Sequence, residues 1–280
     1  MQRDGIRRYD LAMAYSRTKS AARKTRNSRP VRLLARLGYV VSGLLHILIG
    51  VIAIEIATGG GGGEADQSGA LSQLASTPGG VFILWVVVVG FAALGLWLVV
   101  SAFLPPPGEK KRVGHFISAI SKGIVYFVLA ATAFTFARGG STSSASSTGT
   151  ASQDILTSPG GVVVIALIGA VIIVVGVYLL VKGLSKRFTK DLNVPRGASG
   201  KATVALGIFG YVAKGIVLGT VGVLFLVAAA TGNAAKANGL DGALKTLATL
   251  PYGPIILVLV GVGLIAYGLY SFVRARFARL

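Results

Sequence analysis

Six long runs of apolar residues, separated by polar stretches, dominate the chain. Each run reaches the roughly 20 residues that a helix needs to cross a bilayer, and none shows the strict alternation of a membrane β-strand. The pattern therefore predicts an all-α integral membrane protein. The predicted transmembrane helices are residues 38–57, 81–104, 116–137, 161–181, 207–230 and 254–273.

The same arrangement of residues occurs three times along the chain. A short glycine-containing motif opens the first run of each pair, a polar loop follows, and a proline-containing turn opens the second run. Each second run has a glycine at one offset from its proline (Gly95, Gly176 and Gly268), with an aromatic residue two positions later. This periodicity predicts three two-helix repeats. The predicted segments are a basic tail (1–31), repeat 1 (32–104), a linker (105–115), repeat 2 (116–187), a basic linker (188–205), repeat 3 (206–277) and a C-terminal end (278–280).

Basic residues gather on one side of this predicted topology. Residues 1–36 carry 11 Lys and Arg, and the segments 105–115, 182–205 and 274–280 on the same side bring the number to 23 of the chain's 28. Short segments rich in Lys and Arg remain cytoplasmic, so we expect both termini inside. The three repeats then cross the membrane in the same orientation, so we expect a pseudo-threefold axis along the membrane normal to relate them. Anionic lipid headgroups should bind the basic face.

Composition narrows the function further. The chain has no cysteine, two histidines and nine acidic residues. No Ser/His/Asp set, metal-ligand spacing or carboxylate pair is visible, so we expect no catalytic residue, no metal site, no cofactor and no enzymatic activity. The net charge of +19 is explained by the basic residues on one side of the predicted topology. Few aromatic residues lie between the basic residues of the tail. We therefore expect no nucleic-acid partner.

A few polar residues fall inside the predicted spans, where they are costly and are therefore candidates for function. Ser42, Lys122 and Lys214 share one repeat position near the cytoplasmic ends of the first helices, and His46 and Tyr126 follow four residues later. A spacing of four keeps such residues on one helix face. The five could line a cationic vestibule for an anion or a lipid headgroup. Alternatively, the lysine side chains only extend to the membrane surface, and the helix face that bears these residues only packs against neighbouring helices.

Two further features concern the outer side and helix contact. Glu55 lies four residues before Gly59 and is a candidate acid at the outer end of the first helix. Glycines recur at fixed repeat positions, where they allow helices to approach closely. The predicted packing glycines are Gly43, Gly50, Gly123, Gly215, Gly219, Gly222, Gly95, Gly176 and Gly268.

The openings of the first helices are Gly38-Tyr39-Val40-Val41-Ser42-Gly43, Lys122-Gly123-Ile124-Val125-Tyr126 and Gly210-Tyr211-Val212-Ala213-Lys214-Gly215. With these segments and the Pro-x-Gly turns, the chain resembles the bacterial domain-of-unknown-function 1206 family over nearly all of residues 32–277. The resemblance implies repeated pairs of transmembrane helices, and we expect a multi-pass protein of the plasma (inner) membrane of a bacterium. It implies no activity.

The sequence leaves two functions open. The first is a non-catalytic structural or accessory protein that packs against another membrane protein or a second copy of itself. Small-residue faces and few intramembrane polar groups indicate it. The alternative is a transporter or channel for a small anionic solute, indicated by Lys122, Lys214, His46 and Tyr126 on matching faces. A polar cavity that reaches these residues would favour the second function.

Overall fold

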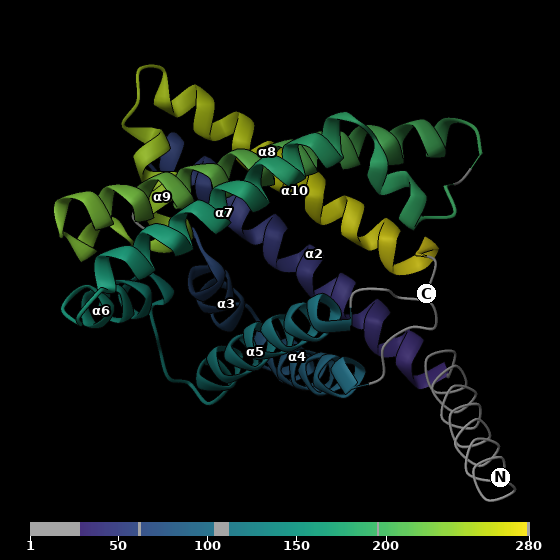
Figure 1. Ribbon diagram of the computed structural model, residues 1–280. Helices are drawn as coiled ribbons and strands as arrows, with labels where there is room; N and C mark the ends of the chain where they lie inside the picture. The colour runs from purple at the N-terminus through teal and green to yellow at the C-terminus, as the bar shows by residue number, and fades with distance from the viewer. Residues whose placement is uncertain (1–28, 61–62, 104–111, 195, 279–280) are drawn as a thin grey trace, which may run out of the picture.

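The computed structural model describes residues 29–60, 63–103, 112–194 and 196–278, which form a bundle of helices (Figure 1). Most of the predicted basic tail and of the first linker lies outside these residues. Six of the described helices are long and apolar enough to cross a membrane, which confirms the predicted number of spans. They are α2 (Arg29–Ala57), α4 (Gly80–Phe103), α5 (Arg112–Ala137), α7 (Gly161–Leu184), α8 (Ala198–Thr231) and α10 (Gly253–Phe277).

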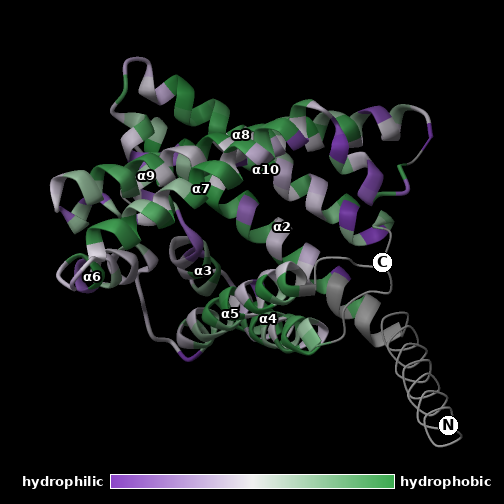
Figure 2. Cartoon of the chain, viewed as in Figure 1, coloured by the Kyte–Doolittle hydropathy of each residue, from purple (hydrophilic) through white to green (hydrophobic). Residues whose placement is uncertain are grey.

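The long helices are apolar on most of their surface, including the faces that no other helix covers (Figure 2). On α7, for example, Val163, Val171 and Val174 are each more than half exposed. A helix that is hydrophobic on all sides is typical of a membrane span. Outward-facing residues contact lipid there, so their exposure carries no cost.

The two ends of the bundle differ. At one end, here called the loop end, short helices precede the turns into α4, α7 and α10 (Figure 1). At the other, here called the basic end, α2 begins and α10 ends, and the short helix η1 (Arg187–Asp191) connects α7 to α8. The short helices of the loop end are α3 (Gln67–Ala75), α6 (Ser144–Leu156), η2 (Ala234–Lys236) and α9 (Gly239–Ala248).

The three proline-containing turns share one backbone conformation. Gly79, Gly160 and Tyr252 follow the prolines and have φ between 60° and 76°, a left-handed conformation that favours glycine and strains Tyr252. The next residue is a glycine in every repeat, because a side chain there would collide with the short helix before it. A Cβ at Gly161 would lie only 1.6 Å from the carbonyl oxygen of Ile155, and the corresponding glycines of the other repeats are as tightly placed.

The long helices pair across repeats rather than within them. The closest pairs are α4 with α5, α7 with α8, and α10 with α2, so the second helix of each repeat contacts the first helix of the next. Within repeats, α8 and α10 are also close neighbours, α2 and α4 touch less, and α5 and α7 barely touch. The sequence predicts repeats of two helices, but their order along the chain does not reveal this exchange of partners.

Glycines form the contact surface of the paired helices. Between α2 and α10, a Cβ on Gly50 would lie 2.6 Å from the carbonyl oxygen of Gly261. Between α7 and α8, a Cβ on Gly222 would lie 2.7 Å from the carbonyl oxygen of Gly169. Such distances are too short for any side chain, so the backbones touch directly. The same contact recurs two turns away at Gly43 with Gly268 and at Gly176 with Gly215. Between α4 and α5 it recurs in looser form at Gly95 with Gly123.

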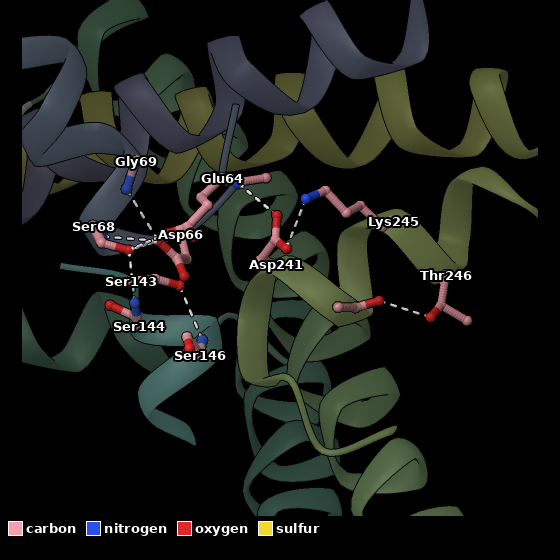
Figure 3. A network of polar contacts seen from close by, with 12 residues as sticks. Glu64, Asp66, Ser68, Gly69, Ser143, Ser144, Ser146, Asp241, Lys245 and Thr246 are labelled. Atoms are coloured by element: carbon pink, nitrogen blue, oxygen red, sulfur yellow. Dashed lines mark hydrogen bonds and ion pairs between the residues drawn. The ribbon is translucent and has the colours of Figure 1, made fainter. Parts of the chain in front are cut away.

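Side-chain hydrogen bonds join the three loops of the loop end (Figure 3). The Asp241 carboxylate of α9 accepts from the backbone N–H of Ala65 at 2.8 Å and from Lys245 Nζ at 2.9 Å. Ser68 Oγ of α3 accepts from the backbone N–H of Ser144, at the start of α6, at 2.9 Å. These bonds tie repeat 1 to repeat 3 and to repeat 2, so the loop end is one connected layer.

Asp66 caps α3 and gives a testable stability effect. Its Oδ1 accepts from the N–H groups of Ser68 and Gly69, while its Oδ2 is buried without a partner. Burial raises the pKa of the Asp66 carboxyl above its ordinary value. A raised folded-state pKa means that stability is lost as the pH rises through that pKa. At neutral pH, Asp66→Asn should therefore be at least as stable as the parent protein, because the amide keeps the cap without the buried charge.

Asp66→Ala serves as the comparison because it removes the cap as well. It should cost about 1 kcal/mol. Thermal unfolding in detergent at about pH 5 and about pH 8 measures both effects, and the difference between Asp66→Asn and the parent should be larger at the higher pH. Equal losses in the Asn and Ala variants would contradict the assignment of a buried, capping carboxylate.

Candidate functional site

The predicted polar face of each first helix is partly exposed near the basic end and becomes buried and apolar toward the loop end. Lys122 is exposed, and Ser42, His46, Tyr126 and Lys214 are half-buried. Further along the same three faces, the side chains are apolar and at most 7% exposed, and they belong to one core. These are Ile49 and Ala53 on α2, Ala133 on α5, and Val221 and Phe225 on α8.

Lys214 and His46 meet, although they come from different repeats. Lys214 Nζ on α8 lies 3.1 Å from His46 Nε2 on α2. His46 Nδ1 lies 2.7 Å from the backbone carbonyl oxygen of Ser42. A carbonyl oxygen only accepts, so Nδ1 carries the imidazole proton and Nε2 accepts from the lysine ammonium. The result is a directed chain of hydrogen bonds from α8 to the backbone of α2.

Tyr267 of α10 completes this contact. The Lys214 ammonium lies 4.5 Å from the centroid of the Tyr267 ring, and the His46 ring lies 4.7 Å from it. An aromatic face attracts a cation by its quadrupole. The sequence reasoning missed Tyr267, because Leu94 and Val175 occupy the equivalent positions of the other repeats and leave no repeat signal. Here Ser42, His46, Lys214 and Tyr267 are called the inner polar site.

A second cation lies near the basic end of α10. The Arg274 guanidinium carbon lies 4.5 Å from the centroid of the Tyr39 ring, and its Nε is buried without a hydrogen-bond partner. The Tyr270 ring, on a side chain that is 0% exposed, packs beside Tyr211 with ring centroids 5.6 Å apart. An unpaired donor such as Arg274 Nε inside a membrane protein is costly, and a ligand or water can complete it.

Among the described residues, no carboxylate forms an ion pair with Lys122, Lys214 or Arg274. The ion pairs found there are Lys182 with Asp191 and Lys245 with Asp241, both at 2.9 Å. Positive charge within the spans near the basic end is therefore not balanced by a carboxylate of the described residues. A buried charge without a counter-ion is strongly destabilising, so an anion is the natural complement of this region.

The structure separates the remaining candidates from this contact. Tyr126 on α5 packs against Phe91 of α4, with ring centroids 5.6 Å apart. Within the described part of the chain, Lys122 on α5 takes no part in the hydrogen bond between Lys214 and His46. Glu55 is exposed near the loop end of α2, far along the helix from His46. Of the predicted glycines, Gly219 differs from the others, because a Cβ built on it meets nothing within 4 Å.

Comparisons with known proteins agree with the repeat structure. A family model described as "Domain of Unknown Function (DUF1206)" matches residues 37–104, 117–186 and 209–278, which is once per repeat. The chain is 31% identical over 264 residues to an uncharacterized protein, YxxB, of Bacillus subtilis (strain 168); the match covers 89% of this chain and 92% of that protein. No solved structure matches.

Proposed function

Because the chain belongs to the DUF1206 family, a domain of unknown function whose model matches it three times, we propose its function from the geometry of the structure. The protein binds a small anionic solute from its basic end and carries it across the membrane. The observation that supports this is a set of cations near the basic end that have no carboxylate partner among the described residues, namely Lys214, Lys122 and Arg274. The helix faces that bear the first two are partly exposed at that level and join the apolar core beyond it. A polar face near one end with an apolar core beyond it suits a carrier that is open on one side.

Orientation and symmetry form part of the proposal. The excess of Lys and Arg at the basic end supports a cytoplasmic position for that end and for both termini, in the plasma membrane of a bacterium. The exchange of helices between successive repeats, α4 with α5, α7 with α8 and α10 with α2, supports a pseudo-threefold axis. The weak contact between α5 and α7 departs from that symmetry, because the two helices of repeat 3 pack closely.

Anion binding can be measured without knowing the solute. The protein in nanodiscs of uncharged lipid is heated with chloride, phosphate, sulfate or acetate at constant ionic strength. A bound anion should raise the unfolding temperature by mass action. Lys214→Gln should abolish that rise, and Lys214→Arg should retain part of it. Lys236→Gln is the matched control, because Lys236 is an exposed cation at the loop end. If no anion stabilises the parent protein, or if both Gln variants respond alike, the proposal fails.

A second function is favoured by the exposed apolar faces of repeat 2. The long helices α5 and α7 have little contact, whereas α8 and α10 of repeat 3 pack closely. As an accessory protein, the chain would bind a helix of another membrane protein on the exposed apolar faces of α5 and α7. Capture of one reproducible partner from native membranes, together with the absence of any anion effect, would favour this function over transport.

A further inference from the structure

The loop end contains a polar cavity of about 530 Å³ that is separate from the inner polar site. It lies between the loop end of α2, the polar face of α3, and the segment that joins α5 to α6. Ile52 and Phe136 provide apolar walls, and both are at most 5% exposed. A volume of this size is typical of small-molecule sites, and nothing in the proposed anion function uses it.

The polar lining of the cavity is acidic and rich in hydroxyl groups. It includes the carboxylates of Glu55 and Glu64, the hydroxyls of Ser68 and Ser143, and the amide of Gln73, and among the described residues no Lys, Arg or His lines it. Glu64 is fixed from one side, because Ser68 Oγ lies 2.6 Å from its Oε2. Carboxylates in a lining without a cation favour a negative potential in the cavity.

The buried polar atoms of this region that have no hydrogen-bond partner are acceptors. Gln73 Oε1, on a lining residue, is buried without a donor. Asp66 Oδ2 is likewise without a donor, on a side chain that is 1% exposed, and Asp66 Oδ1 lies 2.6 Å from Ser68 Oγ in the cavity wall. Because Ser68 has one hydroxyl proton, it cannot donate to Asp66 and Glu64 at the same time. Ser68 therefore leaves at least one of these two carboxylates without its proton.

We propose that this cavity binds a small organic cation, namely a protonated aliphatic amine. Its ammonium group supplies a positive charge beside Glu55 and Glu64 and N–H donors for their free oxygens and for Gln73 Oε1. Its methylene groups lie against Ile52, and the Phe136 ring can add a cation–π contact. A neutral polyol can donate to the carboxylates but leaves their charge without a counter-ion. Among the described residues, no group of three His, Cys, Asp or Glu side chains could hold a metal ion.

A pair of isosteric probes tests the role of charge. Putrescine carries two ammonium groups, and 1,4-butanediol has hydroxyls at the same positions. Binding of each to the full chain in nanodiscs of uncharged lipid is measured by calorimetry at moderate ionic strength. Putrescine should bind at least about tenfold more tightly than the diol, as expected when a charged donor replaces a neutral one at carboxylates. Glu64→Gln and Glu55→Gln should each weaken putrescine binding by about tenfold or more.

Asp154→Asn is the matched control, because Asp154 is an exposed acid on α6 that does not line the cavity. It should bind putrescine as the parent protein does. Equal binding of the two probes would identify a polyol site instead, and equal weakening by Asp154→Asn would show attraction to the surface charge only. Competition by Mg²⁺ or Ca²⁺ at lower concentration than putrescine would show a metal site. Each of these three results would overturn the proposal. The Lys214→Gln variant should bind putrescine normally, so failure of the anion proposal and failure of this one are distinguishable.

Discussion

Replacing Gly222 with alanine should remove most of the folded protein, whereas replacing Gly219 with alanine should leave the folded amount unchanged. A Cβ on Gly222 would lie 2.6 Å from Ile173 Cγ1 and 2.7 Å from the carbonyl oxygen of Gly169. The carbonyl belongs to the backbone of α7 and cannot rotate away, so α7 and α8 must separate. Overpacking of this kind costs about 1–3 kcal/mol, and here it breaks the closest helix pair of the bundle.

Gly219 is the matched control within the same helix. A Cβ on Gly219 meets no atom within 4 Å, so alanine there adds no collision and improves helix propensity by up to about 1 kcal/mol. The measurement is the area of the monodisperse peak in fluorescence-detected size-exclusion chromatography. Equal yields from the two variants would mean that glycine contacts do not hold α7 to α8. The comparison also shows whether the loss comes from the collision between α7 and α8 or from any replacement of glycine in α8.

The sequence predicts the number and approximate position of the long helices, because the bilayer sets a simple length requirement. A run of apolar residues such as Gly161–Leu184 satisfies that requirement by composition alone. Helix ends are less predictable. The helix α8 begins at Ala198, in a small and polar segment ahead of its apolar run, because such residues can continue a helix without contributing to hydrophobicity.

Helix partners could not be predicted from the same pattern. A glycine indicates where another helix can approach closely, but it does not indicate which helix that is. Gly176 is therefore compatible in sequence with contact to its own repeat, while the structure places it on Gly215 of the next one. The segment Gly261-x-Gly263 resembles a nucleotide-binding motif by its letters alone, and in the structure Gly261 packs against Gly50.

The inner polar site was only partly predictable. Alignment of the repeats selects Ser42, His46 and Lys214 as residues of matching faces, but it assigns Lys214 and His46 to different layers. A lysine side chain is long enough to span one helical turn, and so Lys214 reaches the imidazole of the next layer. Tyr267 has no polar equivalent in the other repeats, so no internal comparison could identify it. Arg274 aligns with Ser101 and Lys182, but it lies beyond the predicted span 254–273 and so was not a candidate intramembrane residue.

Accessibility to water should differ strongly between two positions on the same face of α8. Leu218 is half-buried beside the inner polar site, whereas Phe225, two turns further toward the loop end, is 7% exposed within the apolar core. The natural chain has no cysteine, so single substitutions have no background. A membrane-impermeant thiol reagent should modify Leu218→Cys at least about tenfold faster than Phe225→Cys, because the reactive thiolate requires contact with water.

Two exposed positions define the sides of the membrane in the same assay. Ser199, at the start of α8, reports on the basic end, and Ser146, on α6, reports on the loop end. If the basic end is cytoplasmic, Ser199→Cys should react in inverted vesicles and Ser146→Cys in right-side-out vesicles. Leu218→Cys should follow Ser199→Cys. The reverse assignment of the two controls would overturn the proposed orientation without affecting the fold.

Protection of Leu218→Cys by an anion tests the central claim most directly. The modification rate is measured in inverted vesicles with and without the anion that most stabilises the parent protein. An anion held at Lys214, one turn from Leu218, should slow the reaction severalfold, and Lys214→Gln in the same background should remove this protection. A rate that no anion changes, or fast modification of Phe225→Cys from the loop side, would contradict a site that opens only to the basic end.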